Sequence, residues 1–318
     1  AVAVVEVPRA LSGDRSKLFL PRIRNDEATI GAFIFFSLDG LSYNNLGSSG
    51  LELAGGSLIE TLSADAAWID DEGVRFKALG PDMLNAQDLT GQDQLWRVGG
   101  QIAIIDNEWA FVKKVEALGG DLYRASGIIR GRYSTDRSRH AAGANIFLLG
   151  QADLVFFGPE QSIGSSPYFK VQPYNASGAA ELSSLSEYSL NVVGDGIIPP
   201  KPNGINTPEG SASWVAGVDV DLSWKYRNGS SYVGAGEFPA GQAVSTVDQD
   251  GTYTLTLLTT GDSVVQTRTG LTTPEYTVTQ AQFTSWFGAE PTEFKARVVN
   301  VSSLGLISRS VEKTITRV

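Results

Sequence analysis

Short runs of alternating apolar and polar residues recur along the chain, and this period of two is typical of β-strands with one buried face. The clearest run covers 218–224, where Val218, Val220, Leu222 and Trp224 share one face and aspartates and serine share the other. Similar runs lie near 253–257, 294–298 and 311–318. Because they are short and separated by turn residues, the pattern predicts an all-β fold.

Residues 204–318 carry roughly seven such strands, with Trp224 on an early one, which is typical of an immunoglobulin-like or fibronectin type III sandwich. One segment breaks the period of two. Thr279 and Gln282 fit a capping box, and phenylalanines follow at helical spacing before Gly288. We therefore predict one short helix there. The stretch 227–251 is rich in glycine and serine and is predicted to be an insertion loop.

Residues 1–194 are also predicted to be β-rich, as a sandwich-like or barrel-like domain that could comprise two sub-modules, the second ending near 193. Its strands are predicted at 17–20, 30–37, 101–105, 109–115, 122–129 and 144–149. Asp106–Asn107 and Gly119–Gly120 supply hairpin turns between three of them. A glycine and three prolines within 195–203 predict a stiff linker to the second domain.

Composition narrows the function classes. With 42% hydrophobic and 19% charged residues the chain can bury real cores. The absence of cysteine excludes disulfides and thiolate chemistry, and a single histidine excludes a multi-histidine metal site. A formal charge of −10 disfavours nucleic acid as a partner. No apolar run approaches the ~20 residues of a membrane span, so we expect no stable membrane insertion. Since the chain starts at Ala1 without a signal peptide, we expect a piece of a longer protein.

Acidic clusters do not combine into an active site. Asp70, Asp71 and Glu72 precede a glycine and are interpreted as a solvated turn. Asp248 and Asp250 resemble the start of a calcium loop but lack the later ligands. His140 has no recognisable nucleophile motif beside it, and no glycine-rich phosphate loop occurs. We predict no catalytic residues, no metal site, no cofactor and no enzymatic activity.

One segment concentrates positive charge in this acidic chain. It contains Arg130, Arg132, Arg137, Arg139 and His140. Guanidinium groups of this kind hold phosphates or carboxylates, so the loop could contact a host surface. Alternatively they tie a long loop to carbonyls and acids of the same chain, which is the interpretation we favour. The spacing of Arg130 and Arg132 at a strand end predicts that both project to one face.

The same segment carries a family resemblance. An apolar residue, Arg-Gly-Arg, Thr-Asp, a histidine and Ala-Gly precede an apolar strand, and the stretch 101–111 upstream forms a strand, an acidic turn and a second strand. The pattern resembles the tail-tip, or baseplate hub, proteins of long-tailed phages and gene transfer agents. The matching residues are Gly127, Arg130, Gly131, Arg132, Thr135, Asp136, His140, Ala142 and Gly143. Residues 133–134, where a more basic or glycine-like pair is expected, depart from the pattern. Residues 204–318 look like the fibronectin type III modules of such tail proteins.

The resemblance implies a non-catalytic virion protein at the tail tip that contributes to tail assembly and host-surface attachment. It implies a homotrimer, distal tail and hub proteins as partners, a host receptor or glycan as target, and an extracellular location when mature. An alternative function remains open: a glycan-binding β-sandwich module of a larger secreted protein, with exposed aromatic rings stacking on sugars. The aromatic residues to suspect are Trp68, Trp96, Trp214 and Tyr232.

Overall fold

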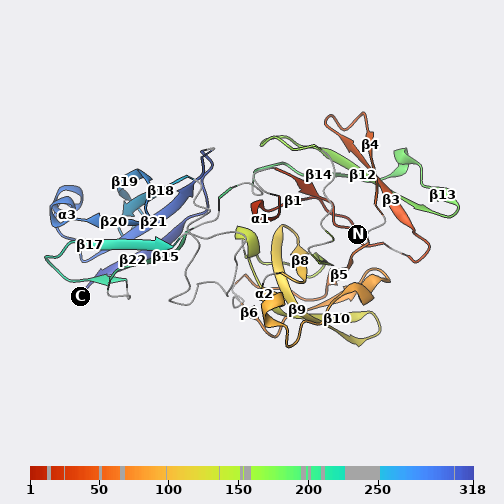
Figure 1. Cartoon of the computed structure of the whole chain (residues 1–318), viewed down its shortest axis with the longest axis horizontal. Coiled ribbons are helices and arrows are strands. Elements are labelled where there is room, and N and C mark those ends of the chain that lie inside the picture. The colour runs from red at the N-terminus through yellow and green to blue at the C-terminus, as the bar shows by residue number, and fades with distance from the viewer. Residues whose placement is uncertain are drawn as a thin grey trace. The chain divides into compact units, whose positions relative to one another are not determined.

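The computed structural model consists mainly of β-strands and confirms the predicted all-β fold class (Figure 1). It describes the chain except residues 13–15, 25, 50–51, 65–68, 98, 136, 151–152, 154–158, 195–197, 200–201, 209–211, 226–250 and 304. Two compact units are present: a first unit, Ala1–Ile197, and a second unit, Ile198–Val318. The division lies within the residues assigned to the linker. The predicted insertion loop falls outside the described residues apart from Gly251.

Six strands of the first unit close into an antiparallel barrel. The order is β10, β7, β5, β11, β8, β9 and back to β10. These strands and the short β6, which also pairs with β10, are β5 (Ala54–Leu58), β6 (Ile69–Asp70), β7 (Val74–Ala78), β8 (Ile102–Ile105), β9 (Glu108–Gly119), β10 (Leu122–Ile129) and β11 (Asn145–Leu149). The barrel-like architecture expected for this part of the chain is therefore confirmed.

The barrel interior is filled by small and branched side chains. One buried cluster draws members from all six strands, including Ala54, Phe76, Ala103, Ala110 and Ile146. Side chains alternate across a strand, so a cluster shared by every strand of a closed barrel lies inside it. The opposite faces of β8 and β9 are also buried, against the amino-terminal segment of the chain.

A second sheet completes the first unit. It consists of β3 (Gly31–Ser37), β4 (Asn44–Ser49), β12 (Tyr168–Asn175), β13 (Gly178–Ala179) and β14 (Glu187–Ser189). The remaining elements are the ribbon of β1 (Val5–Glu6) and β2 (Leu18–Phe19), the helices α1 (Arg9–Ser12) and α2 (Asp93–Arg97), and 3-10 turns at Asp82–Asn85, Arg132–Ser134 and Leu182–Ser184. The inner face of the sheet packs Ile34, Phe36 and Phe169 against Leu18 and Leu20.

The second unit is a sandwich of two sheets. One sheet contains β15 (Asn203–Asn206), β17 (Val220–Lys225) and β20 (Glu275–Val278). The other, in spatial order, contains β16 (Ser213–Trp214), β22 (Val311–Arg317), β21 (Glu293–Val301), β18 (Thr252–Leu258) and β19 (Val264–Leu271). Seven main strands are divided three and four between the two sheets, and the short β16 pairs with β22 at the edge of the second sheet. This is a fibronectin type III-like arrangement.

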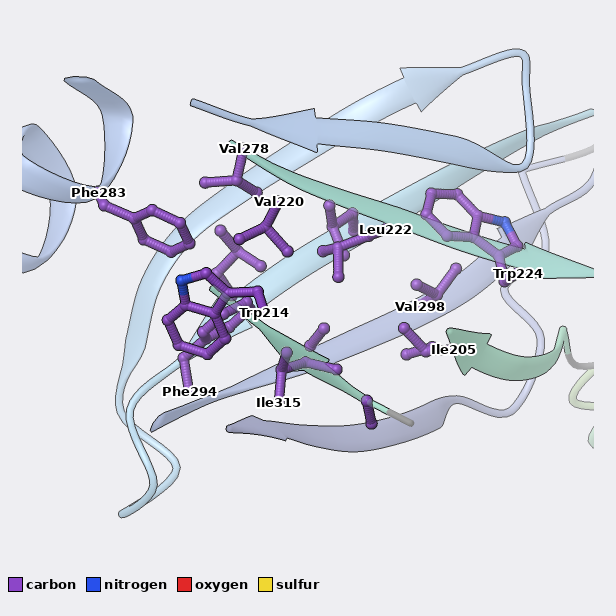
Figure 2. Packing of buried hydrophobic residues seen from close by; sticks show 14 of the residues in the cluster. Ile205, Trp214, Val220, Leu222, Trp224, Val278, Phe283, Phe294, Val298 and Ile315 are labelled. Carbon is purple, nitrogen blue, oxygen red and sulfur yellow. The ribbon is translucent and has the colours of Figure 1, made fainter. Parts of the chain in front are cut away.

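Alternating residues of both sheets build the sandwich core (Figure 2). Trp224 lies at one end near Ile205 and Val298, and Trp214 lies at the other with Phe294. The predicted inward positions of 220, 222 and 224 agree with this burial. The prediction for Val218 is wrong: it is 54% exposed because β17 starts only at Val220.

The predicted helix is present as α3 (Gln280–Phe287). Thr279 accepts a hydrogen bond from the Gln282 amide, and the Gln282 side chain accepts one from the Thr279 amide, so the capping box satisfies two amides at the helix start. Gly288 ends the helix in a left-handed conformation with φ of 80°. Phe283 is fully buried in the sandwich core. Among the described residues, no helix has the length and apolar character needed to cross a membrane.

Candidate functional site

The segment that carries the arginines crosses one end of the barrel, and we call residues 130–143 the strap. At this end β8 and β10 finish while β9 and β11 begin. The strap leaves β10 after Ile129 and is tied to the barrel by paired backbone hydrogen bonds between His140 and Leu62, both of 2.9 Å. The positive φ of Gly131, 60°, makes the sharp turn that starts it.

A fully buried ion pair lies beneath the strap. Arg130 is 0% exposed and Glu108, the first residue of β9, is 1% exposed. The guanidinium Nε and Nη2 donate to the two carboxylate oxygens at 2.6 Å each. This parallel arrangement is the strong bidentate form of an arginine–carboxylate contact.

Both charged groups also bind the backbone around them. Arg130 also donates to the carbonyl oxygens of Ser63 at 3.0 Å and Ser138 at 2.7 Å. Glu108 also accepts from the amides of Gly131 at 2.8 Å and Ser138 at 3.2 Å. The pair therefore joins three separate parts of the chain, and a buried charge is tolerated only when it is paired and hydrogen-bonded in this way.

His140 lies between two carboxylates. Its Nε2 is 2.9 Å from an oxygen of Glu108, and its Nδ1 is 2.7 Å from an oxygen of Asp106, whose side chain is 58% exposed. With a carboxylate facing each nitrogen, both nitrogens carry a proton and donate it, so the ring is positively charged. Burial lowers the pKa of His140, but the hydrogen bonds to Glu108 and Asp106 outweigh burial and the pKa is raised above its ordinary value.

The Glu108 carboxylate is held in its charged form. Burial alone would raise its pKa, yet the hydrogen bonds from Arg130 and His140 dominate and lower the pKa to about 2. Arg130 and His140 supply two positive charges, and Glu108 and Asp106 supply two negative ones. The cluster is electrically balanced and is built to hold the strap in place.

Beyond Gly131, residues of the strap pack against aromatic rings of β9. The Arg132 guanidinium carbon lies 4.6 Å from the centre of the Phe111 ring, a cation–π distance. Tyr133, with φ of 52°, packs edge-on against Phe111 and Trp109. The Thr135 hydroxyl donates to the Arg132 carbonyl at 2.8 Å and accepts from the Trp109 amide at 3.0 Å.

The four arginines do not share one face. Since β10 ends at Ile129 and Gly131 is left-handed, no strand period relates Arg130 to Arg132, and that expectation is corrected. Arg130 and Arg132 are buried, Arg137 is half-buried and Arg139 is exposed. Of the arginines considered for a host contact, Arg139 presents the most surface.

The geometry is unsuited to acid–base catalysis by a serine. Ser138 Oγ lies 3.4 Å from His140 Nε2, and Asp106 binds the other nitrogen, which superficially matches a catalytic triad. However, Glu108 occupies Nε2 at the shorter distance of 2.9 Å. A ring that donates through both nitrogens has no lone pair to accept the serine proton.

Those of the other candidate residues that the structure describes have structural roles. Asp70 accepts from the Gly73 amide at 2.8 Å in a turn, as predicted. Trp96 and Trp214 are 3% and 2% exposed, so neither offers a ring face to a sugar. Trp68, Tyr232, Asp248 and Asp250 lie outside the described residues. Across the described part of the chain, no group of three or more acidic or histidine side chains is arranged to hold a metal ion.

The central residue of the cluster is one that the sequence did not single out. The pattern predicts a turn at Asp106–Asn107 and a strand from 109, whereas Glu108 itself begins the strand, whose first five residues are all buried. A glutamate directly before the apolar run 109–112 is the available signal, since an unpaired charge there would be costly. Its partners Arg130 and His140 are 22 and 32 residues away.

Comparisons with known proteins add little to this geometry. No family model matches the chain, and no curated protein matches it. Solved structures that align with it include a two-domain fibronectin type III segment of chicken tenascin (8% identity, 83% of this chain and 99% of that one, TM-score 0.23). Others are the FN1–FN3 domains of chicken CNTN1 (9%, 99% and 98%, TM-score 0.23) and the chicken interferon gamma receptor alpha chain (10%, 83% and 97%, TM-score 0.29). At these TM-scores, the fold description rests on the strand order itself.

Proposed function

We propose that this chain is a structural component of the tail tip of a phage or phage-like particle. In this role it contributes to tail assembly and host-surface attachment and performs no catalysis. Its partners are distal tail and hub proteins and further copies of itself in a homotrimer. Its location is the virion, outside the cell when mature, and its target is a receptor or glycan of the host surface.

The observation that supports this proposal most is that several residues carrying the family resemblance hold the strap or the end of β10 in place. Arg130 and His140 bind Glu108, and Thr135 fastens the Arg132 carbonyl. Gly127 has a φ of 60°, and a Cβ there would come within 2.6 Å of the Lys113 Cβ. The structural roles of Gly127, Arg130, Thr135 and His140 are what support carrying the family resemblance over to this chain.

The test is to locate the chain in particles. Antibodies raised against residues 1–318 would be applied to particles released by the organism that encodes the chain and viewed by electron microscopy. The proposal expects label at the tail end distal to the head, and genes for a tape measure and a distal tail protein beside the gene for this chain. Particles that remain unlabelled, with the chain recovered only as free protein, would contradict the tail-tip role.

A specific observation also favours the second candidate, a glycan-binding module. Phe33 on β3 and Tyr174 on β12 are half-buried on the outer face of the second sheet, with ring centres 4.9 Å apart. They belong to none of the buried clusters among the described residues. Aromatic rings on a sheet face suit stacking on sugars. A glycan array with wild-type chain and with Tyr174→Ala separates the candidates, since binding lost in the variant would favour the module.

A further inference from the structure

The outer face of the second sheet carries a row of aromatic side chains. Ile34, Phe36 and Phe169 pack into the buried cluster on the inner face, so alternation directs their neighbours on β3 and β12 outward. The aromatic side chains on the outer side are all half-buried and belong to none of the buried clusters among the described residues. We call them the aromatic face, and they are Phe33, Phe35, Tyr43, Tyr168 and Tyr174.

The strand register spreads these rings along the sheet. Phe33 on β3 lies opposite Gln172 on β12, and paired residues point to the same side of a sheet. Phe33 is therefore a diagonal neighbour of Tyr174, and their ring centres are 4.9 Å apart. Tyr168 and Tyr174 are six residues apart on β12, which is about 20 Å of extended strand. The aromatic face is accordingly long in one direction.

At the Tyr168 end, polar contacts add Tyr43 to the face. The Tyr43 hydroxyl donates to Glu187 on β14, and the Lys170 ammonium lies 4.9 Å from the centre of the Tyr43 ring, a cation–π distance. Lys170 in turn lies opposite Phe35 on one neighbouring strand and Glu187 on the other. This end of the face therefore combines rings with a cation and a carboxylate.

The polar side chains of the face are held in place by backbone carbonyls. Gln172 Nε2 donates to the Ala180 carbonyl at 2.5 Å, and Lys170 Nζ donates to the Leu182 carbonyl at 3.3 Å. An ammonium has three donors, and a side-chain amide has an oxygen acceptor besides its donors, so both groups can bind further hydroxyls. Side chains fixed beforehand lose little conformational entropy when a ligand binds, which favours association.

This combination of groups suits a sugar. A pyranose ring has an apolar C–H face and hydroxyls on its rim, so it needs an aromatic ring beneath it and hydrogen-bonding side chains beside it. The core of a protein interface is depleted in lysine and glutamate, whereas Lys170 and Glu187 lie among the rings here. A lipid chain on the same rings would take both charges away from water, which is costly.

Charge selects among sugars. Lys170 and Glu187 balance each other on the face, but the whole chain has a formal charge of −10. A polymer with a carboxylate or phosphate on every repeat is repelled by a protein of that charge, whereas an uncharged polymer is not. The favoured ligand is therefore an uncharged sugar chain.

We propose that the aromatic face binds an extended, uncharged polysaccharide whose chain runs along β12 and stacks on rings at both ends of the face. The inference rests on the proposed glycan target and names its class and its site. A ligand that stacks at both ends must reach from Tyr174 to Tyr168, so its affinity depends on the number of sugar units that it contains.

The test is isothermal titration calorimetry of the full chain with chitin and cellulose oligomers of two and of six sugar units. The hexamer is expected to bind roughly 100-fold more tightly than the dimer, because only the longer oligomer contacts both ends at once. Tyr168→Ala and Tyr174→Ala should each weaken binding of the hexamer by roughly tenfold, and the double variant should bind hexamer and dimer equally. A galacturonate hexamer, with a carboxylate on every unit, should bind more weakly than the uncharged ones.

Controls separate loss of binding from loss of fold. Trp286→Ala removes a half-buried ring of the second unit and should leave the affinity unchanged. Each variant should keep the wild-type melting curve of the first unit, and Tyr168→Leu replaces Tyr168→Ala if that variant does not.

Four results would overturn the proposal. Absence of binding by both uncharged hexamers would do so and would leave the tail-tip role standing. Equal affinities for dimer and hexamer would indicate recognition of a terminal sugar, and binding unaffected by either tyrosine variant would place the glycan on another surface. Tighter binding of the galacturonate hexamer would contradict the charge argument.

Discussion

Replacing Arg130 by methionine tests how much the buried pair contributes to the first unit. The substitution keeps an unbranched side chain of similar length but leaves the Glu108 carboxylate, 1% exposed, without two charge-assisted hydrogen bonds of 2.6 Å. It also leaves the carbonyls of Ser63 and Ser138 without a donor. Breaking a buried pair from one side costs about 3–5 kcal/mol, because the remaining charge stays buried.

The effect is measurable as a melting shift. A loss of this size corresponds to a fall in Tm of about 6–20 °C for a unit of this length. Scanning calorimetry of the full chain would follow the transition of the first unit. In the double variant Arg130→Met/Glu108→Gln no unpaired carboxylate remains, so the loss should be smaller than the sum of the two single losses.

An exposed pair of the same residue types, in which both arginine nitrogens donate to one carboxylate oxygen, provides the control. Arg75 Nε and Nη2 bind Glu60 at 3.0 and 2.6 Å, but their side chains are 49% and 33% exposed. Solvent screens such a pair, so Arg75→Met should leave the Tm within experimental error. If Arg130→Met shifted the Tm no further than this control, the burial argument would be refuted.

Three further predictions concern the two units separately. Since the pKa of His140 is raised, its contribution to the stability of the first unit is complete below about pH 6.5 and is lost as pH rises through the folded-state pKa. The contribution of Glu108 is complete above about pH 4.5 and is lost as pH falls toward 2. Calorimetry should therefore find the first unit most stable between about pH 4.5 and 6.5, and His140→Gln should remove the decline on the alkaline side. Trp224→Ala, at a side chain 3% exposed, should cost the second unit about 3–5 kcal/mol in urea unfolding, and an unchanged midpoint would contradict its place in the core. Gly127→Ala should lower the Tm of the first unit through both its φ and its contact with Lys113, while Gly143→Ala, which has a positive φ but no neighbour within 4 Å, should lower it less.

Local signals in the sequence predicted local structure well. The α3 helix follows from residues within one segment: the capping box of Thr279 and Gln282 starts it and Gly288 ends it. Alternation likewise identified β17, because its inward residues must be apolar. Alternation does not mark where a strand begins, however. Val218 fits the alternating pattern but lies in the loop before β17, where its carbonyl oxygen accepts a hydrogen bond from the Gln280 side chain.

The candidate site could be predicted only in part. The Arg-Gly-Arg and histidine were visible because they gather positive charge in an acidic chain. Their partner Glu108 was not, since it lies 22 residues from Arg130 at the open end of the β9–β10 hairpin, and only the register of that hairpin brings the two residues together. The sequence could not tell whether Trp96 and Trp214 stack on a sugar or lie in a core, because large aromatic residues occur in both places and the tertiary fold sets their burial. In the structure both are buried.

The central claim is that Arg130 and Arg132 hold the strap against the barrel through contacts within the same chain, which we propose to be part of a tail tip. The most direct test is the rate of host adsorption per assembled particle for wild type and for Arg130→Met, beside the Tm of each purified chain. The account predicts a lowered Tm and fewer assembled particles, with each assembled particle adsorbing at the wild-type rate. An unchanged Tm together with lost adsorption would contradict it and make the strap the host-binding site.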